Sequence, residues 1–224
     1  MSGTTLLLSG ADLANAPELR NSAYRMRKRV FADEMQWDVT VVDGMEFDQF
    51  DRPDTAYVLH LIDGEVACHW RFLPTTGPYM LSEVFPQHAP GGVIPRDPKI
   101  WELSRFAMEM GRFRGDGHRD YVQTEMFCMF AEFCLLHGIM ELVLVQHPGI
   151  TRLSNSFFGR PHVMTTPKKT GICDAHTVMY RPAFAKDLAQ SRDLYGFSAP
   201  LVPQFNLYSH SSSGFGLPGQ VAAE

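Results

Sequence analysis

Three carboxylates lie close together in a segment that also contains aromatic residues. The sequence MEFDQFD carries Glu46, Asp48 and Asp51, with two phenylalanines among the acids. The charges alone are also consistent with a solvated acidic loop, but the aromatic residues indicate that part of the segment is packed. Carboxylates held in a packed setting can bind a cationic group.

An arginine and two aromatic residues precede these acids. Arg27 and Phe31 are four residues apart and therefore share one face of a helix, and Trp37 follows six residues later. Together with the carboxylates, they can form a pocket for a ligand that carries a flat ring, a cation and an anion. Stacking would hold the ring, the carboxylates the cation and the guanidinium the anion.

A second group of polar residues lies in the apolar segment IWELSRF. Strand alternation predicts Glu102 and Ser104 on one face and Arg105 on the other. Burying the glutamate without a partner is costly, so it either does chemistry or pairs with an arginine across a sheet. Arg71, in the apolar segment 65–74, likewise needs a buried anion or a route to solvent.

The elements that position these residues follow from hydrophobic spacing and turn signals. A helix is predicted over 17–35, a polar loop over 38–54, and a hairpin whose two strands meet at Asp63-Gly64. The other predicted elements are strands over 99–110, 140–147 and 173–182, and helices over 120–138, 154–159 and 182–196. A hairpin followed by alternating helices and strands implies one mixed sheet covered by helices.

Composition limits the class of protein. The chain of 224 residues, 45% hydrophobic and 20% charged, fits one globular domain, expected over 1–208, and a Ser/Gly-rich flexible tail over 209–224. The net charge of −5 argues against a nucleic-acid binder, and no apolar run is long enough for a membrane span. The cysteine and histidine spacing predicts no metal site, and the first residues do not resemble a secretory signal, so we expect a cytoplasmic protein.

The chemistry-bearing residues occur in an order typical of one family. The chain resembles the acyl-homoserine-lactone synthases, the autoinducer synthases of bacterial quorum sensing, and the matching anchors are Arg27, Phe31, Trp37, Asp48, Asp51, Arg71, Glu102 and Arg105. The segments RFLPTTGPYMLSEVF and WELSRF extend the resemblance, which is dense over 25–108 and weaker to about 181. It implies an α/β (α+β) fold similar to the GCN5-related N-acyltransferases: one three-layer domain whose twisted mixed sheet, split near its middle, is flanked by helices.

The resemblance also implies a reaction. Family members join S-adenosylmethionine to an acyl thioester: the amine attacks the thioester carbonyl, and the carboxylate then displaces the sulfonium. The products are an N-acyl-homoserine lactone and methylthioadenosine. S-adenosylmethionine and acyl-coenzyme A or acyl carrier protein would be substrates, with no tightly bound cofactor. An N-acyltransferase for another amine and a non-catalytic sensor of such ligands remain alternatives.

Roles for individual residues follow from this chemistry. Glu102 would be the general base, Asp48 would orient the cationic end of S-adenosylmethionine, and the backbone N–H of Phe106 would stabilise the oxyanion. The other residues expected to bind S-adenosylmethionine are Arg27, Phe31, Trp37, Asp51, Arg71 and Arg105.

The thioester side involves a loop and an apolar pocket. Arg112, Gly115 and Gly117 have the spacing of coenzyme A-binding acyltransferases, in which loop N–H groups and a helix start hold a pyrophosphate. The residues expected to contact the acyl group or thioester also include Phe85, Ser104, Phe106, Phe127, Val143, Leu144 and Val145. In the family a threonine on this strand accompanies 3-oxo chains, so its absence over 143–145 predicts an unsubstituted acyl group.

The identity of the acyl carrier is left open by the sequence. Acyl carrier protein is an acidic partner and would need a basic docking patch. Such a patch could consist of Arg152, Arg160, Lys168 and Lys169, which could equally be solvated surface residues. The Arg112 loop slightly favours a coenzyme A thioester.

Overall fold

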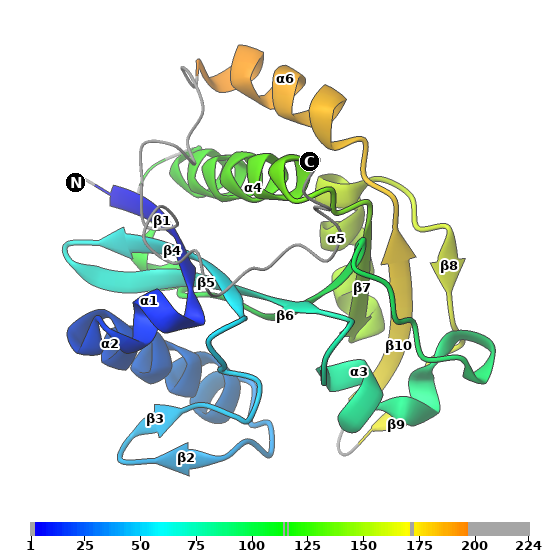
Figure 1. The fold of residues 1–224 in the computed structure, drawn as a ribbon. Coiled ribbons are helices and arrows are strands. Elements are labelled where there is room, and N and C mark those ends of the chain that lie inside the picture. The colour runs from blue at the N-terminus through cyan, green and yellow to red at the C-terminus, as the bar shows by residue number, and fades with distance from the viewer. Residues whose placement is uncertain (1–2, 114, 116, 171–172, 197–224) are drawn as a thin grey trace, which may run out of the picture.

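A computed structural model describes residues 3–113, 115, 117–170 and 173–196. Within them, an eight-stranded sheet has the order β1-β4-β5-β6-β7-β10-β8, with β9 paired to β10 (Figure 1). Neighbouring strands of this sheet are antiparallel except β6 and β7, which are parallel. The mixed sheet predicted from the sequence is confirmed.

The first strands of the sheet form around a tight hairpin. Strand β4 (Ala56–Ile62) pairs with β5 (Glu65–Pro74), and both turn residues, Asp63 and Gly64, have positive φ (52° and 80°). This is the geometry of a two-residue turn that matches strand twist, so the predicted hairpin is confirmed. Strand β1 (Gly3–Ser9), which was not predicted, pairs with the other edge of β4.

Helices cover both faces of the sheet (Figure 1). On one face lie α1 (Gly10–Ala14) and α2 (Pro17–Arg27), which continues as the π-helical segment η1 (Lys28–Glu34). Pro17 suits the first turn because the N–H that it lacks would have no partner there. On the other face lies α4 (His118–Leu136), and α6 (Phe184–Tyr195) covers α4 from outside. The arrangement is the predicted three-layer one.

The later strands and the connections complete the architecture. The remaining strands are β2 (Val41–Val42), β3 (Met45–Glu46), β6 (Ile100–Met108), β7 (Glu141–Gln146), β8 (Val163–Met164), β9 (Lys168–Thr170) and β10 (Cys173–Tyr180). The remaining helices are α3 (Met80–Glu83) and α5 (Thr151–Phe158), with short 3-10 turns η2 (Pro86–His88), η3 (Pro90–Gly92), η4 (Met110–Arg112) and η5 (Pro148–Ile150). The predicted polar loop over 38–54 therefore contains the β2–β3 hairpin.

The sheet opens between its two parallel strands. Pairing of β6 with β7 runs from Ile100 and Glu141 to Glu102 and Val143. Both strands continue beyond this point, β6 to Met108 and β7 to Gln146, and they diverge (Figure 1). The result is the split near the middle of the sheet that the resemblance implies.

A bulge in β6 changes the direction of its side chains. Ser104 lies opposite Arg71 and Ala107 opposite His69, so Arg105 and Phe106 together face the single residue Trp70. Arg105 has a φ of 49°. The prediction that Arg105 points away from Glu102 and Ser104 is wrong, because a bulge resets the alternation of a strand and Arg105 turns to the same side.

The packed interior lies on both faces of the sheet. One apolar cluster packs α4 against β5, with Trp70 and Phe130 among its members, and another packs α2 against β4. None of the helices in the described residues combines the length and apolar character that crossing a membrane requires. The predicted domain over 1–208 stays a prediction, and the predicted tail over 209–224 lies outside the described residues.

Candidate active site

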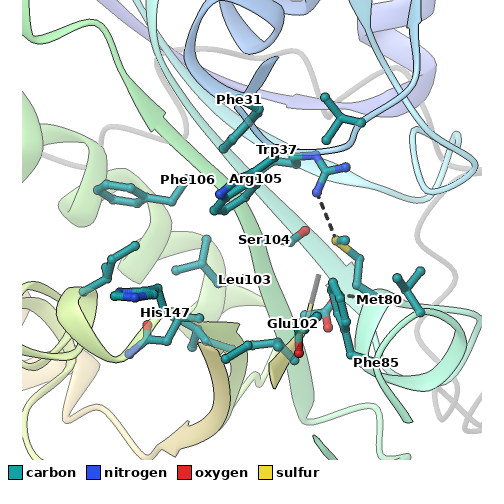
Figure 2. A pocket seen from close by; sticks show the side chains of 18 of the residues that line it. Phe31, Trp37, Met80, Phe85, Glu102, Leu103, Ser104, Arg105, Phe106 and His147 are labelled. Carbon is teal, nitrogen blue, oxygen red and sulfur yellow. Dashed lines mark hydrogen bonds between the residues drawn. The ribbon is translucent and has the colours of Figure 1, made fainter. Parts of the chain in front are cut away.

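One cavity of about 610 Å³ passes through the opening between β6 and β7. Phe31 and Trp37 line one end of it, and Glu102 lies away from them, beside Phe85 (Figure 2). Residues from both faces of the sheet contribute, since Phe85 packs with the cluster beside α3 and Phe157 with the cluster beside α4. The cavity therefore connects the two faces.

Three arginines and three carboxylates form a network beside one end of this cavity. Arg27 donates to Glu46 through Nε (2.5 Å) and to Asp51 through Nη1 (2.7 Å). Arg71 donates to both oxygens of Asp48 (2.6 and 3.0 Å) and lies 3.2 Å from Asp51. The arginine on β6, residue 105, lies 3.0 Å from the Glu46 carboxylate and 2.9 Å from that of Asp48. The sequence-predicted charged residues are thus brought together.

The network has a buried layer and a layer that faces the cavity. Arg27 and Arg71 are fully buried, and neither they nor Asp51 line the cavity, whereas Asp48 and Arg105 do. Burial alone would raise the pKa of Asp51, but the guanidinium groups of Arg27 and Arg71 outweigh it and hold that pKa well below its usual range. Both arginines hold carboxylates of the network in place, so the prediction that Arg27 and Arg71 bind S-adenosylmethionine gains no support from their positions and stays a prediction.

Glu46 is the member of the network that was not among the anchors of the family resemblance. It is fully buried and bridges Arg27 and Arg105. The available signal was its place two residues before Asp48, since residues two apart share a face of an extended segment.

Two stacked aromatic rings line the cavity beside these charges. The rings of Phe31 and Trp37 lie 5.2 Å apart at 17°, and the Arg105 guanidinium lies 5.4 Å from the Phe31 ring centroid. The π-helical segment η1 carries Phe31, and the backbone N–H of Trp37 donates to the Phe31 carbonyl (2.9 Å). A flat ring with a cationic neighbour is the ligand chemistry that such a wall accommodates.

Glu102 is a buried carboxylate at the opening of the sheet. Its two oxygens accept hydrogen bonds from the backbone N–H groups of Met80 (2.9 Å) and Leu81 (2.8 Å), at the start of α3. Burial raises the pKa of Glu102 to about 7, although these N–H groups and the arginines at 71 and 105 oppose the shift. A carboxylate with a pKa near neutrality is suited to accept a proton during catalysis.

The residues expected near the thioester divide into two sets. Phe85, Ser104, Phe106, Leu144 and Val145 line the cavity (the first three are labelled in Figure 2). Phe127 and Val143 do not line it. Phe127 packs behind Phe157, with ring centroids 6.4 Å apart, and Val143 belongs to the cluster beside α3. The prediction that these two side chains contact the acyl group therefore gains no support from their positions.

The loop before α4 lies apart from the cavity lining. Gly115 and Gly117 have positive φ (85° and 80°), and Gly117 directly precedes the helix. Arg112 donates to the carbonyl oxygen of Ile62 (2.6 Å) and lies 3.7 Å from Glu109. The four residues of the predicted basic patch, Arg152, Arg160, Lys168 and Lys169, are exposed, and Lys169 pairs with Asp174.

These features define the fold of the GCN5-related N-acyltransferases: a mixed sheet split between parallel strands, helices on both faces and a buried glutamate at the split. A proposed N-acetyltransferase from Lactobacillus plantarum shares the fold, with a TM-score of 0.53 at 14% identity over 81% of this chain and 99% of that one.

More specific likenesses identify the family. The family model for autoinducer synthases matches residues 12–178. An acyl-homoserine-lactone synthase of Pseudomonas aeruginosa is 37% identical over 139 residues, which cover 61% of this chain and 69% of that protein. The solved coenzyme A-dependent acyl-homoserine lactone synthase BjaI, with S-adenosylmethionine and isopentyl-coenzyme A, has a TM-score of 0.73 at 26% identity, over 88% of this chain and 92% of that one. The chain belongs to the autoinducer synthase family and is an acyltransferase.

Proposed function

We propose that this enzyme transfers an acyl group from a coenzyme A thioester to the amine of S-adenosylmethionine and then closes the lactone. The amine attacks the thioester carbonyl, and collapse of the tetrahedral intermediate expels the thiolate and leaves an amide. The methionine carboxylate then attacks the carbon next to the sulfonium and breaks its C–S bond. One N-acyl-homoserine lactone, one free thiol, one methylthioadenosine and one proton result.

The buried glutamate at the sheet opening is the observation that carries this proposal. The attacking amine must first lose a proton, and an α-amino group has an ordinary pKa of about 8. A Glu102 whose pKa is raised to about 7 can accept that proton with little energetic mismatch. Each of its oxygens accepts one backbone N–H and keeps a lone pair, so the proton would reach this carboxylate directly or through a water molecule.

The charged end of the cavity suits S-adenosylmethionine. Phe31 and Trp37 would hold the nucleoside and methionine portions. Asp48 would orient the ammonium group, and Arg105, the arginine that lines the cavity, would face the carboxylate. Arg27, Arg71 and Asp51 would act through these two groups. Arg71 pairs with Asp48 and Asp51, and Arg27 pairs with Asp51 and with Glu46, the partner of Arg105.

The other end of the cavity suits the acyl group. The backbone N–H of Phe106, at the bulge beside the opening, would donate to the oxyanion of the tetrahedral intermediate. The apolar lining around Phe85, Leu144 and Val145 would hold the acyl chain, and it offers no hydroxyl group on β7 over 143–145 for an oxygen-substituted chain.

Coenzyme A is the favoured acyl carrier. Gly115 and Gly117 place no side chain in front of α4, a helix of 19 residues whose first N–H groups could donate to a pyrophosphate, and Arg112 comes shortly before them in the chain. BjaI, the solved relative, contains isopentyl-coenzyme A. We also infer a cytoplasmic location, which the free cysteines at 68, 128, 134 and 173 support, since reducing compartments preserve thiols.

A donor panel tests the proposal. The purified protein is mixed with S-adenosylmethionine and matched acyl groups carried either by coenzyme A or by acyl carrier protein, and the lactone is detected by mass spectrometry. Formation of lactone and methylthioadenosine in equal amounts from the coenzyme A donors is expected. Turnover with acyl carrier protein alone would refute the carrier assignment, and binding of both substrates without release of methylthioadenosine would refute the reaction.

A further inference from the structure

Arg105 has a backbone conformation that residues other than glycine rarely adopt. Its φ is 49°, and it lies at the bulge where it and Phe106 together face Trp70. In bulges with a left-handed first residue, that residue is usually glycine. An arginine persists there only if surrounding contacts hold it.

One such contact comes from a buried histidine. Nδ1 of His69 lies 2.9 Å from the carbonyl oxygen of Arg105, and because a carbonyl can only accept, Nδ1 carries the proton and donates. The His69 ring is fully buried, and the Tyr57 ring meets it edge-on at 5.5 Å. Burial, reinforced by the charge of Arg27, lowers the pKa of His69 to about 3, so the imidazole is neutral at physiological pH.

The side chain of Arg105 is held independently. Its Nε and Nη2 donate to one oxygen of Glu46 (3.1 and 3.0 Å), and Nη2 lies 2.9 Å from Asp48. The residue is therefore fixed at its guanidinium group by carboxylates and at its carbonyl oxygen by His69.

The carbonyl of Arg105 and the N–H of Phe106 belong to the same planar peptide group, so they point in opposite directions. A hydrogen bond that fixes the carbonyl therefore also fixes the direction of the N–H. It also polarises the peptide group and so strengthens that N–H as a donor. Phe106 itself lines the cavity, and His69 is not among the described residues that line it.

We propose that His69 is a positioning residue, which holds the Arg105–Phe106 peptide group so that the Phe106 N–H points at the oxyanion of the tetrahedral intermediate. This inference rests on the proposed function, because an oxyanion must form beside this peptide group. His69 acts only through the peptide group and touches neither substrate.

Two substitutions separate the donor from the packing. His69→Leu keeps an apolar side chain of moderate size but has no donor, whereas His69→Asn places an N–H close to the position of Nδ1. Complete loss of one oxyanion donor lowers kcat by about 10²- to 10³-fold, and a misdirected donor costs less. We expect His69→Leu to lower kcat by about 10- to 100-fold, with the KM and Kd for S-adenosylmethionine unchanged, and His69→Asn to recover most of that loss.

Each rate is divided by the concentration of sites that bind S-adenosylmethionine, so that misfolded protein does not count. If the leucine variant binds none, His69→Met provides the same donor-free test. A donor-free variant with the wild-type kcat would overturn the proposal, and so would an asparagine variant as slow as the donor-free one. Disappearance of the acidic limb of the pH–rate profile in these variants would also overturn it, because His69 would then be the base.

The outcome is distinguishable from failure of the proposed function. If the wild-type protein releases no methylthioadenosine with any donor, the proposed reaction is wrong. If the wild-type protein turns over and the donor-free variants match it, only the positioning role of His69 is wrong.

Discussion

The two ends of the cavity are built differently. At the charged end, three arginines and three carboxylates are paired with one another, so the position of each side chain depends on the others. At the acyl end, separate apolar side chains from β7 and α5 form the wall, among them Leu144 and Phe157. A substitution at the charged end therefore disturbs a whole network, whereas one at the acyl end changes a local shape.

The largest effect is expected at Glu102, at the opening of the sheet. Glu102→Gln should lower kcat by about 10²- to 10⁴-fold, the range for loss of a general base, because an amide cannot take the proton from the amine. Binding of S-adenosylmethionine, measured by calorimetry, should be retained. Glu109→Gln, the same change at a glutamate that pairs with Arg29 and does not line the cavity, is the control. A Glu102→Gln variant with near-normal turnover would remove this residue from the mechanism.

The pH dependence tests the same group. Glu102 must be deprotonated to act as a base, and its pKa is raised to about 7 by burial. The wild-type rate should therefore rise as the pH passes upward through about 7, and the residual rate of Glu102→Gln should lack this limb. An acidic limb near pH 4, the ordinary range for a glutamate, would show that burial does not tune the group.

The charged end should fail as a unit when one buried member is removed. Arg27→Met leaves Glu46 and Asp51 without their shared cation, and breaking a buried ion network in this way costs about 3–5 kcal/mol of unfolding free energy. Lys28→Met, next along the helix, breaks only an exposed pair with Asp33 and should cost about 0–1 kcal/mol. Denaturant unfolding measures both. Equal losses for the two variants would contradict the idea of a cooperative network.

The acyl end should instead respond with a change of preference. Phe157→Leu shortens a side chain that lines the cavity, so longer acyl thioesters should gain over shorter ones by about tenfold in kcat/KM, the range for one methylene in an apolar pocket. Phe127→Leu removes a similar ring that packs directly behind Phe157 and should leave the preference unchanged. If both variants shift the preference equally, the boundary between lining and core is misplaced.

The smallest effect is expected outside the cavity. Arg112→Gln should raise the KM for coenzyme A thioesters about two- to fivefold, because a partly exposed charge contributes no more than about 1 kcal/mol, and the effect should shrink at high salt. Arg152→Gln, in the exposed patch, should leave this KM unchanged. The opposite result would place the coenzyme A site at the exposed patch instead of the loop before α4.

The charged end was largely predictable from the sequence. Arg27, Asp48, Asp51 and Arg71 are charged residues in segments that also have an apolar face, and a buried charge needs a partner. The partners themselves were less predictable. Arg27 and Arg71 lie behind the cavity lining, and Glu46 bridges two arginines. Both facts depend on how separate segments pack together.

The acyl end was predictable only in part, because an apolar side chain that lines a cavity has the same local pattern as one in the core. Phe127 and Phe106 illustrate this, since both are phenylalanines in apolar elements and only the second reaches the cavity. The side of the sheet to which Arg105 points also could not be predicted from the local pattern of strand alternation. Its positive φ depends on contacts with His69 and Glu46, which lie 36 and 59 residues away in sequence.

The opening between β6 and β7 has edges made of main chain, since it begins where the pairing of Glu102 with Val143 ends. Side chains on either face can change which molecules bind there, but the main chain sets the width of the opening. Enzymes of this family can therefore change the acyl group that they accept while the two substrates still meet at the same main-chain opening. Diversity of signal and constancy of chemistry then arise from the same architecture.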